Sequence, residues 1–185
     1  MIDQFSEKAG IKISERRPIL YLNKEDIFQG NELLRNLGIQ KKEKFIVLGC
    51  ETGIKGLAPD KHDPRTWNDF QEIVEKIKKK YNIKILTLLP KSSNDGPMGT
   101  IRVMDEPTIR AGAAIIKRCA LYIGVDCGLT HMASTFDVKM ISIHVAEAAF
   151  PIEHYGSLSP HTKFVSKNSM QHEKNNEQNF TDKIM

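Results

Sequence analysis

The side chains with the clearest chemical potential follow an apolar run in the stretch YIGVDCGLTHMAS (122–134). The run stops at Asp126, and Cys127 and Gly128 then open a segment with the pattern of a short helix. A carboxylate at the tip of a buried strand lowers the stability of the fold unless it is paired or hydrogen-bonded, so its presence calls for a function. Free amides at the start of a helix favour a phosphate, whereas Asp126 would repel one and would accept hydrogen bonds from sugar hydroxyls. The pattern therefore indicates a ligand in which a diphosphate is joined to a sugar.

Other predicted strand tips carry groups of the same kind. Gly49, Thr52 and Gly53 follow a predicted strand, and they allow a sharp turn that brings amide donors close to an anion. Lys61 comes just before the next predicted helix. His131 lies off the apolar stripe of its own helix, so it faces a cleft or solvent. Each feature is weak alone, because DCG before a helix matches neither a GxGxxG nor a Walker loop.

Plainer roles stay open for the same residues. Asp126 could cap the helix that starts at Gly128, and a cap and a ligand contact can coexist. Cys127 could be a packing or turn residue, and no neighbour indicates an activated nucleophile. Lys61 could be an ordinary surface lysine. The six histidines include no HxxxH pair, so we expect no metal site.

The elements that must position these residues alternate between strand and helix along most of the chain. Strands are predicted over 19–22, 45–48, 83–89, 101–104, 121–125 and 139–145, and helices begin after Asn23, after Thr66, at Pro107 and at Gly128. This order predicts an α/β, Rossmann-like fold, with a mostly parallel sheet and helices on both faces. Ligands bind such sheets at the carboxyl ends of the strands, near the point where the strand order reverses.

Capping and periodicity give further expectations for the helices. Asn23 and Asp26 have the spacing of a capping box, and Thr66 is expected to start the next helix in the same way. Ile109 is expected on the buried face of the helix that begins at Pro107. Residues 1–17 are expected to be an irregular lead-in.

Length and composition fit one globular domain with extra segments, because the chain has 185 residues and 40% of them are hydrophobic. We divide it into the lead-in, a domain over 18–167 and a polar tail over 168–185. The sequence predicts neither a signal peptide nor a membrane-spanning run, and its three cysteines without CxxC spacing favour a reduced cytosol. The net charge of +4 is mild, so the lysine runs are read as solvated surfaces. Contact with nucleic acid or an anionic membrane is the alternative for these runs, and the partners we expect for the chain include no nucleic acid.

The stretch VDCGLTHMAS resembles the Asp-(Ser/Thr)-Gly-x-x-His-(Leu/Met)-Ala signature of glycosyltransferase family 9, the ADP-heptose:lipopolysaccharide heptosyltransferase-like enzymes. Further stretches resemble the family in order and spacing over roughly residues 17–167. These stretches are RRPILYL, FIVLGCETG, DKHDPRTWNDFQEIVEKI, PTIRAGAAIIKRCALYIGVD and HYGSLSPHTKFVS.

The resemblance implies the C-terminal, donor-binding half of a two-domain GT-B glycosyltransferase. The implied reaction transfers a sugar from a nucleotide-diphosphate sugar, ADP-linked in the name-giving enzymes, to a saccharide or lipid-linked acceptor such as lipopolysaccharide core. No cofactor or metal is implied. The acceptor site and the catalytic base belong to the family's N-terminal domain, so we assign no base here. The resemblance implies a cytoplasmic location, and it allows peripheral association with the inner face of the membrane.

The resemblance also implies which residues bind the donor, and these are Thr52, Lys61, Asp126, Cys127, Gly128 and His131. Lys61 would contact the diphosphate, and Thr52 would lie in the phosphate-facing loop. The amides of Cys127 and Gly128 would hold the diphosphate, Asp126 would meet the sugar hydroxyls, and His131 would stand close by.

The chain departs from the family pattern at several positions. Asp63-Pro64 replaces the usual Trp-Pro, Cys127 replaces the signature Ser or Thr, and Lys139 and Val145 replace a proline and a glycine. The donor's identity therefore stays open.

Two other functions stay open as well. One is a non-catalytic nucleotide-binding module, or a split-gene half that acts only with a separate N-terminal-domain protein. The other is an epimerase of the same two-domain architecture.

Overall fold

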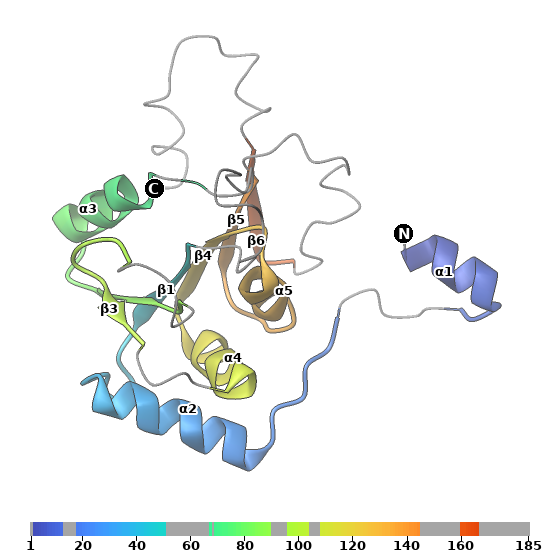
Figure 1. Cartoon of the computed structure of the whole chain (residues 1–185), viewed down its shortest axis with the longest axis horizontal. Helices are drawn as coiled ribbons and strands as arrows, with labels where there is room; N and C mark the ends of the chain where they lie inside the picture. The colour runs from blue at the N-terminus through green and yellow to red at the C-terminus, as the bar shows by residue number, and fades with distance from the viewer. Residues whose placement is uncertain are drawn as a thin grey trace, which may run out of the picture.

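The computed structural model describes residues 2–12, 18–50, 67, 69–89, 96–103, 108–144 and 160–166. Its centre is a sheet of six strands in the order β3-β2-β1-β4-β5-β6, and every neighbouring pair is parallel (Figure 1). The strands are β1 (Phe45–Gly49), β2 (Lys84–Thr87), β3 (Ile101–Arg102), β4 (Leu121–Val125), β5 (Met140–His144) and β6 (Thr162–Ser166). The predicted parallel Rossmann-like sheet is therefore confirmed. The strand order reverses between β1 and β4, which makes their carboxyl ends the switch point.

The described residues contain five helices, which are α1 (Ile2–Ala9), α2 (Lys24–Asn36), α3 (Phe70–Lys80), α4 (Ile109–Arg118) and α5 (Gly128–Ser134). Buried side chains of α2, α4 and α5 pack with one face of the sheet, and those of α3 pack with the other face. Helices therefore lie on both faces, as the sequence predicted. Figure 1 shows α1 apart from the sheet. None of the described helices has the length and apolarity needed to cross a membrane.

The pair α2 and α4 shows why the local sequence folds as predicted. The Asn23 side chain accepts a hydrogen bond from the Asp26 amide, and the Asp26 carboxylate accepts one from the Asn23 amide, each at 2.8 Å. This is the expected capping box. The same carboxylate accepts from Nε of Arg110 on α4 at 2.9 Å, which ties the start of α2 to α4. The Arg110 guanidinium holds the pKa of Asp26 below its ordinary value.

Two expectations near the amino terminus were wrong. Residues 19–22 form no strand, although Leu20 and Leu22 pack on the core while Ile19 and Tyr21 are exposed. The alternation is that of a strand, but the carbonyl of Tyr21 accepts from the Arg110 guanidinium rather than from a neighbouring strand. The lead-in is not irregular throughout, because α1 occupies part of it. At the other end of the domain, β6 is a strand that the sequence analysis did not predict.

The predicted starts and faces of two helices also need correction. Helix α3 begins at Phe70 with Asp69 at the N-cap, so the helix starts four residues after Thr66, which lies outside the described residues. In α4 the side chain of Ile109 is 76% exposed, although Ile116, seven residues later on the same face, is buried as predicted. Ile109 is the first residue of that helix and lies beyond the end of the stripe.

Candidate functional site

The candidate site lies at the switch point, where β1 and β4 end side by side. Gly49 is the last residue of β1, and it stands opposite Gly124 in the parallel register. One residue later β4 ends at Val125, and Asp126 is the first residue beyond it. A polypeptide with this topology leaves a crevice outside the carboxyl ends of these two strands. Asp126 is therefore placed where such sheets bind ligands.

Asp126 and His131 form the accessible part of the site. The Nε2 atom of His131 lies 3.4 Å from Oδ1 of Asp126, and the two side chains are 53% and 25% exposed. His131 is the fourth residue of the seven-residue helix α5. Helical side chains lean toward the amino terminus of their helix, which brings the His131 ring back toward the strand tip. The hydrogen bond to Asp126 raises the pKa of His131 above its ordinary value, against a smaller opposing effect of burial. The pair offers a carboxylate acceptor and an imidazole donor, a combination that suits ligand hydroxyls.

A buried network of two hydroxyls lies directly beneath this pair. The Thr130 hydroxyl donates to the carbonyl oxygen of Val125, and the Tyr122 hydroxyl lies 2.9 Å from the Thr130 oxygen. Since the Thr130 hydrogen is already directed at Val125, Tyr122 is the donor to Thr130. The Cys127 sulfur lies 3.7 Å from the Thr130 oxygen and 3.9 Å from the Tyr122 oxygen. Strand β4, the turn after it and helix α5 are thus joined by side-chain contacts.

Two glycines make room for the Tyr122 ring in this network. A Cβ built on Gly49 would lie 2.1 Å from the Tyr122 hydroxyl oxygen, and one built on Gly124 would lie 2.4 Å from it. A side chain at Gly49 or at Gly124 would therefore clash with Tyr122 unless Tyr122 moved. Burial raises the pKa of Tyr122 well above its ordinary value, so the hydroxyl stays protonated and available as a donor.

His144, at the carboxyl end of β5, is a neighbour that the sequence analysis gave no role. It is buried, and its Nε2 lies 2.9 Å from the Ser142 hydroxyl. Burial lowers its pKa, while the nearby carboxylate of Asp126 acts in the opposite direction. The signal was present in the sequence, because alternate residues of a strand share a face and Ser142 and His144 are two apart.

The structure brings together four of the six predicted donor-binding residues. These are Asp126, Cys127, Gly128 and His131, which lie just beyond the tip of β4 and in α5. Thr52 and Lys61 lie outside the described residues. Cys127, rather than Asp126, occupies the N-cap position of α5. The Cys127 thiol is buried against Tyr122 and Thr130, which agrees with the packing role that was left open for it. The described residues include no group of three or more His, Cys, Asp or Glu that could hold a metal.

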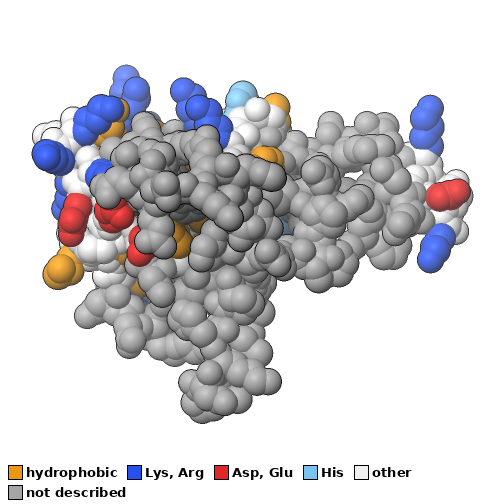
Figure 2. All heavy atoms as spheres, turned by 90° about the horizontal axis from the view of Figure 1, so that it is seen from above, with side chains coloured by type: hydrophobic (Ala, Val, Ile, Leu, Met, Phe, Trp, Pro, Cys, Tyr) orange, Lys and Arg blue, Asp and Glu red, His pale blue; other side chains and the backbone are white. Residues whose placement is uncertain are grey.

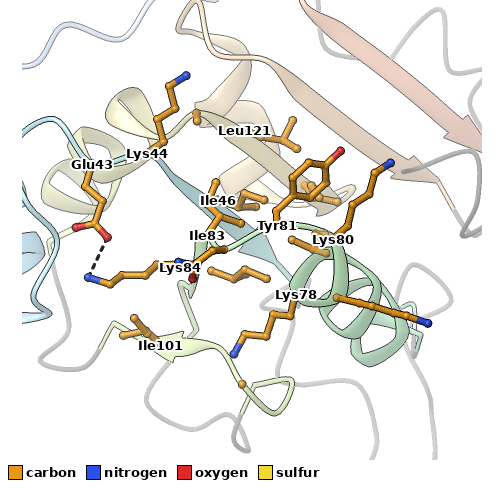
Figure 3. Close-up of a pocket in the computed structure, with 17 residues that line it drawn as sticks. Glu43, Lys44, Ile46, Lys78, Lys80, Tyr81, Ile83, Lys84, Ile101 and Leu121 are labelled. Atoms are coloured by element: carbon orange, nitrogen blue, oxygen red, sulfur yellow. Dashed lines mark ion pairs between the residues drawn. The ribbon is translucent and has the colours of Figure 1, made fainter.

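A lysine-rich hollow lies at the opposite, amino-terminal edge of the sheet. Figure 2 shows Lys and Arg side chains gathered mainly toward the end of the molecule where Figure 1 places α3 and β3. The hollow has a volume of about 1270 Å³, and its apolar floor includes Ile46, Ile83 and Leu121 (Figure 3). Lysines from the end of α3 and the start of β2 border it, and Nζ of Lys84 pairs with Glu43 at 2.9 Å. Cations at a helix carboxyl end complement the helix dipole, so these lysines have an ordinary structural explanation.

Comparison with known proteins places the chain in a family. The model of glycosyltransferase family 9 (heptosyltransferase) matches residues 66–184. No curated protein sequence matches the chain significantly.

Solved structures support the fold. A family 9 glycosyl transferase from Veillonella parvula DSM 2008 superposes with a TM-score of 0.68 at 15% identity, over 95% of this chain and 52% of that one. ADP-heptose lps heptosyltransferase II of E. coli gives 0.58 at 10% identity, over 80% and 45%. E. coli heptosyltransferase WaaC with ADP gives 0.57 at 12% identity, over 89% and 48%. The chain spans about half the length of these structures, and the likeness shows a shared fold. With a family model that matches more than half of its residues, the chain belongs to glycosyltransferase family 9.

Proposed function

We propose that this chain is the donor-binding domain of a glycosyltransferase and that it binds a nucleotide-diphosphate sugar outside the carboxyl ends of β1 and β4. The observation that carries the proposal is the position of Asp126. In a family 9 chain, its carboxylate stands at the switch point beside His131, at 3.4 Å, and keeps part of its surface open to a ligand. A carboxylate in this place is suited to the hydroxyls of a sugar.

The proposal divides the donor between two sets of groups. Asp126 accepts hydrogen bonds from sugar hydroxyls, and His131 lies close enough to donate to the same part of the ligand. The amides of Cys127 and Gly128 face the diphosphate, together with Lys61 and the loop that contains Thr52. Positive groups at the diphosphate would lower the cost of the charge that grows on it as the sugar leaves.

The nucleotide can be proposed for this chain alone, whereas the acceptor can be proposed only for the chain together with a second domain. The similar WaaC structure was determined with ADP, so ADP is the first nucleotide to test. Transfer to a saccharide such as lipopolysaccharide core needs the half of the matched structures that this chain does not cover, either in the same polypeptide or in a separate protein. We propose the acceptor reaction only for the chain together with that half. Cys50, Cys119 and Cys127 are all buried, and the reducing, cytoplasmic setting remains part of the proposal.

Calorimetric titration with ADP, UDP and GDP, and then with an ADP-linked sugar, tests the donor site. Asp126→Asn should weaken the nucleotide sugar by about ten- to hundredfold, the range for a hydrogen bond to a charged group. The same variant should change the affinity for ADP much less, because the sugar is the part that Asp126 contacts. Glu75→Gln removes the same charge from the surface of α3 and is the matched control. If the wild-type chain binds none of the three nucleotides, the proposal is wrong.

A second candidate function is a non-catalytic nucleotide-binding module. The observation in its favour is that Cys127 replaces the Ser or Thr of the family signature. An assay of sugar transfer with a co-expressed family 9 amino-terminal half separates the two. Transfer that depends on both halves supports the enzyme, and nucleotide binding without transfer supports the module.

A further inference from the structure

We propose that Tyr122 and Thr130 are positioning residues that hold the turn over 125–127, so that Asp126 keeps its place beside His131. The inference rests on the proposed function for its biological purpose. Its structural content, which is that two buried hydroxyls set the position of an exposed carboxylate, can be tested on the free chain.

A hydroxyl of α5 holds the end of β4. The Thr130 hydroxyl on α5 donates to the carbonyl of Val125, the last residue of that strand. Removing this hydroxyl would leave a buried carbonyl without that donor, and such a group is costly to bury. The bond therefore fixes the direction in which the chain leaves the sheet, one residue before Asp126.

The buried side chain of Cys127 holds the other side of the turn. The Cys127 thiol is 6% exposed and lies within 4 Å of both the Thr130 and the Tyr122 oxygen atoms. Asp126 thus has an anchored neighbour on each side, since Val125 is held by its carbonyl and Cys127 by its buried side chain. The carboxylate projects from a short segment that is constrained at both ends.

The network also reaches β1 through Tyr122. The Tyr122 hydroxyl occupies the space over Gly49 and Gly124, where a Cβ on either residue would lie within 2.5 Å of its oxygen. The Tyr122 ring therefore packs against the tips of both strands at the switch point while its hydroxyl donates to Thr130 at 2.9 Å. A purely apolar filler such as phenylalanine would occupy the same room without holding Thr130.

The position of His131 provides a readout that a merely structural role would not affect. Among the described residues, the titratable groups that interact with His131 are Asp126 and His144, and the bond to Asp126 is the largest influence on its pKa. If the turn loosens, the contact at 3.4 Å between Asp126 and His131 should lengthen. The pKa of His131 should then fall toward its ordinary value even though neither residue has been changed.

The experiment compares the wild-type chain with Thr130→Val, Thr130→Ser and Tyr122→Phe. NMR titration of the His131 ring, assigned with His131→Gln, reports the contact, and calorimetry with an ADP-linked sugar reports the site. We expect Thr130→Val to lower the pKa of His131 and to weaken the nucleotide sugar by about two- to tenfold, the equivalent of one hydrogen bond. Thr130→Ser, which keeps the hydroxyl, should restore both. Tyr122→Phe should show a smaller change of the same sign.

Folded Thr130→Val protein with an unchanged His131 pKa would overturn the inference and leave only a packing role. If Thr130→Val does not fold, Tyr122→Phe carries the same test, because it removes one oxygen atom and keeps the ring. A wild-type chain that binds no nucleotide sugar would refute the proposed function, whereas the His131 titration would still decide whether the network positions Asp126.

Discussion

The carboxyl ends of the parallel strands form one side of the sheet, called here the carboxyl edge, and their amino ends form the opposite side, the amino edge. Both carry polar side chains, but in different surroundings. At the carboxyl edge, the hydroxyls of Tyr122 and Thr130 are buried and bonded to each other, and the open groups are the neighbours Asp126 and His131. At the amino edge, exposed lysines border a hollow of about 1270 Å³ with an apolar floor (Figure 3). Buried polar groups are costly unless satisfied, whereas exposed lysines cost little. The difference indicates that a constrained arrangement, rather than volume or charge, marks the site.

The largest expected effect comes from filling the space above the strand tips. Gly124→Ala should lower the free energy of unfolding by about 1 to 3 kcal/mol, as overpacking of a well-filled core does. A Cβ there would lie 2.4 Å from the Tyr122 oxygen and 2.7 Å from its ring. Chemical denaturation measures the change.

Gly49→Ala has a matched rescue. Without the Tyr122 oxygen, the nearest atom to a Cβ on Gly49 is 3.0 Å away. The double variant with Tyr122→Phe should therefore recover part of the lost stability.

At the amino edge, a Cβ on Gly99 would meet the flexible end of Lys78, so Gly99→Ala should cost only the strain of its positive φ, about 1 kcal/mol. Equal losses at Gly99 and Gly124 would remove the contrast between the edges.

The next effect concerns ligand binding at each edge. Asp126→Ala should weaken an ADP-linked sugar by about tenfold or more, which corresponds to about 1.4 kcal/mol. Lys80→Ala, at the border of the amino-edge hollow, should leave that affinity unchanged. Titration calorimetry compares the two variants under the same conditions. A loss of affinity in Lys80→Ala as large as that in Asp126→Ala would contradict the proposed placement of the ligand at the carboxyl edge.

A smaller effect concerns the pH dependence of stability, in which the two histidines act with opposite signs. Burial lowers the pKa of His144, so its contribution to stability is complete above the ordinary value of 6.5 and is lost as the pH falls. Asp126 raises the pKa of His131, so its contribution is complete below 6.5 and is lost as the pH rises through the raised value.

Urea denaturation between about pH 5 and pH 8, where histidines titrate, separates these contributions. Replacing His144 with Gln should reduce the loss of stability on the acid side. Replacing His131 with Gln should make that loss steeper. Identical pH profiles for the two variants would show that the local charges at this edge are not arranged as described.

The smallest effect is expected at the amino edge. Lys80→Ala should change the free energy of unfolding by less than about 0.5 kcal/mol, as is usual for surface positions. Its ammonium lies 5.4 Å from the centre of the exposed Tyr81 ring, where a cation–π contact contributes little. A loss comparable to that of Gly124→Ala would contradict the contrast between the two edges.

Much of the fold was predictable because local pattern and topology agree. The capping box at Asn23 and the apolar runs of the central strands act through neighbouring residues, and the alternation of strands and helices then predicts the parallel sheet. The segment 19–22 was misread because its alternation reflects packing on the core beside Arg110 rather than pairing in a sheet. The exposure of Ile109 depends on where α4 begins, and helix ends are the least certain part of such predictions.

The accessible part of the site was predictable from a single short stretch, since Asp126 and His131 lie in one motif. Its support was not, because Tyr122, Thr130 and Gly49 come from different elements and meet only when β1, β4 and α5 pack together. His144 joins the group through the strand order, which brings β5 beside β4. Contacts made by tertiary packing leave little trace in sequence spacing.

The most direct test of the account is a crystal structure of the chain soaked with ADP. We predict density for the nucleotide outside the carboxyl ends of β1 and β4, with the diphosphate near Gly128 and its far end directed toward Asp126. Density in the lysine-rich hollow at the amino edge, with none beside Gly128, would contradict the account.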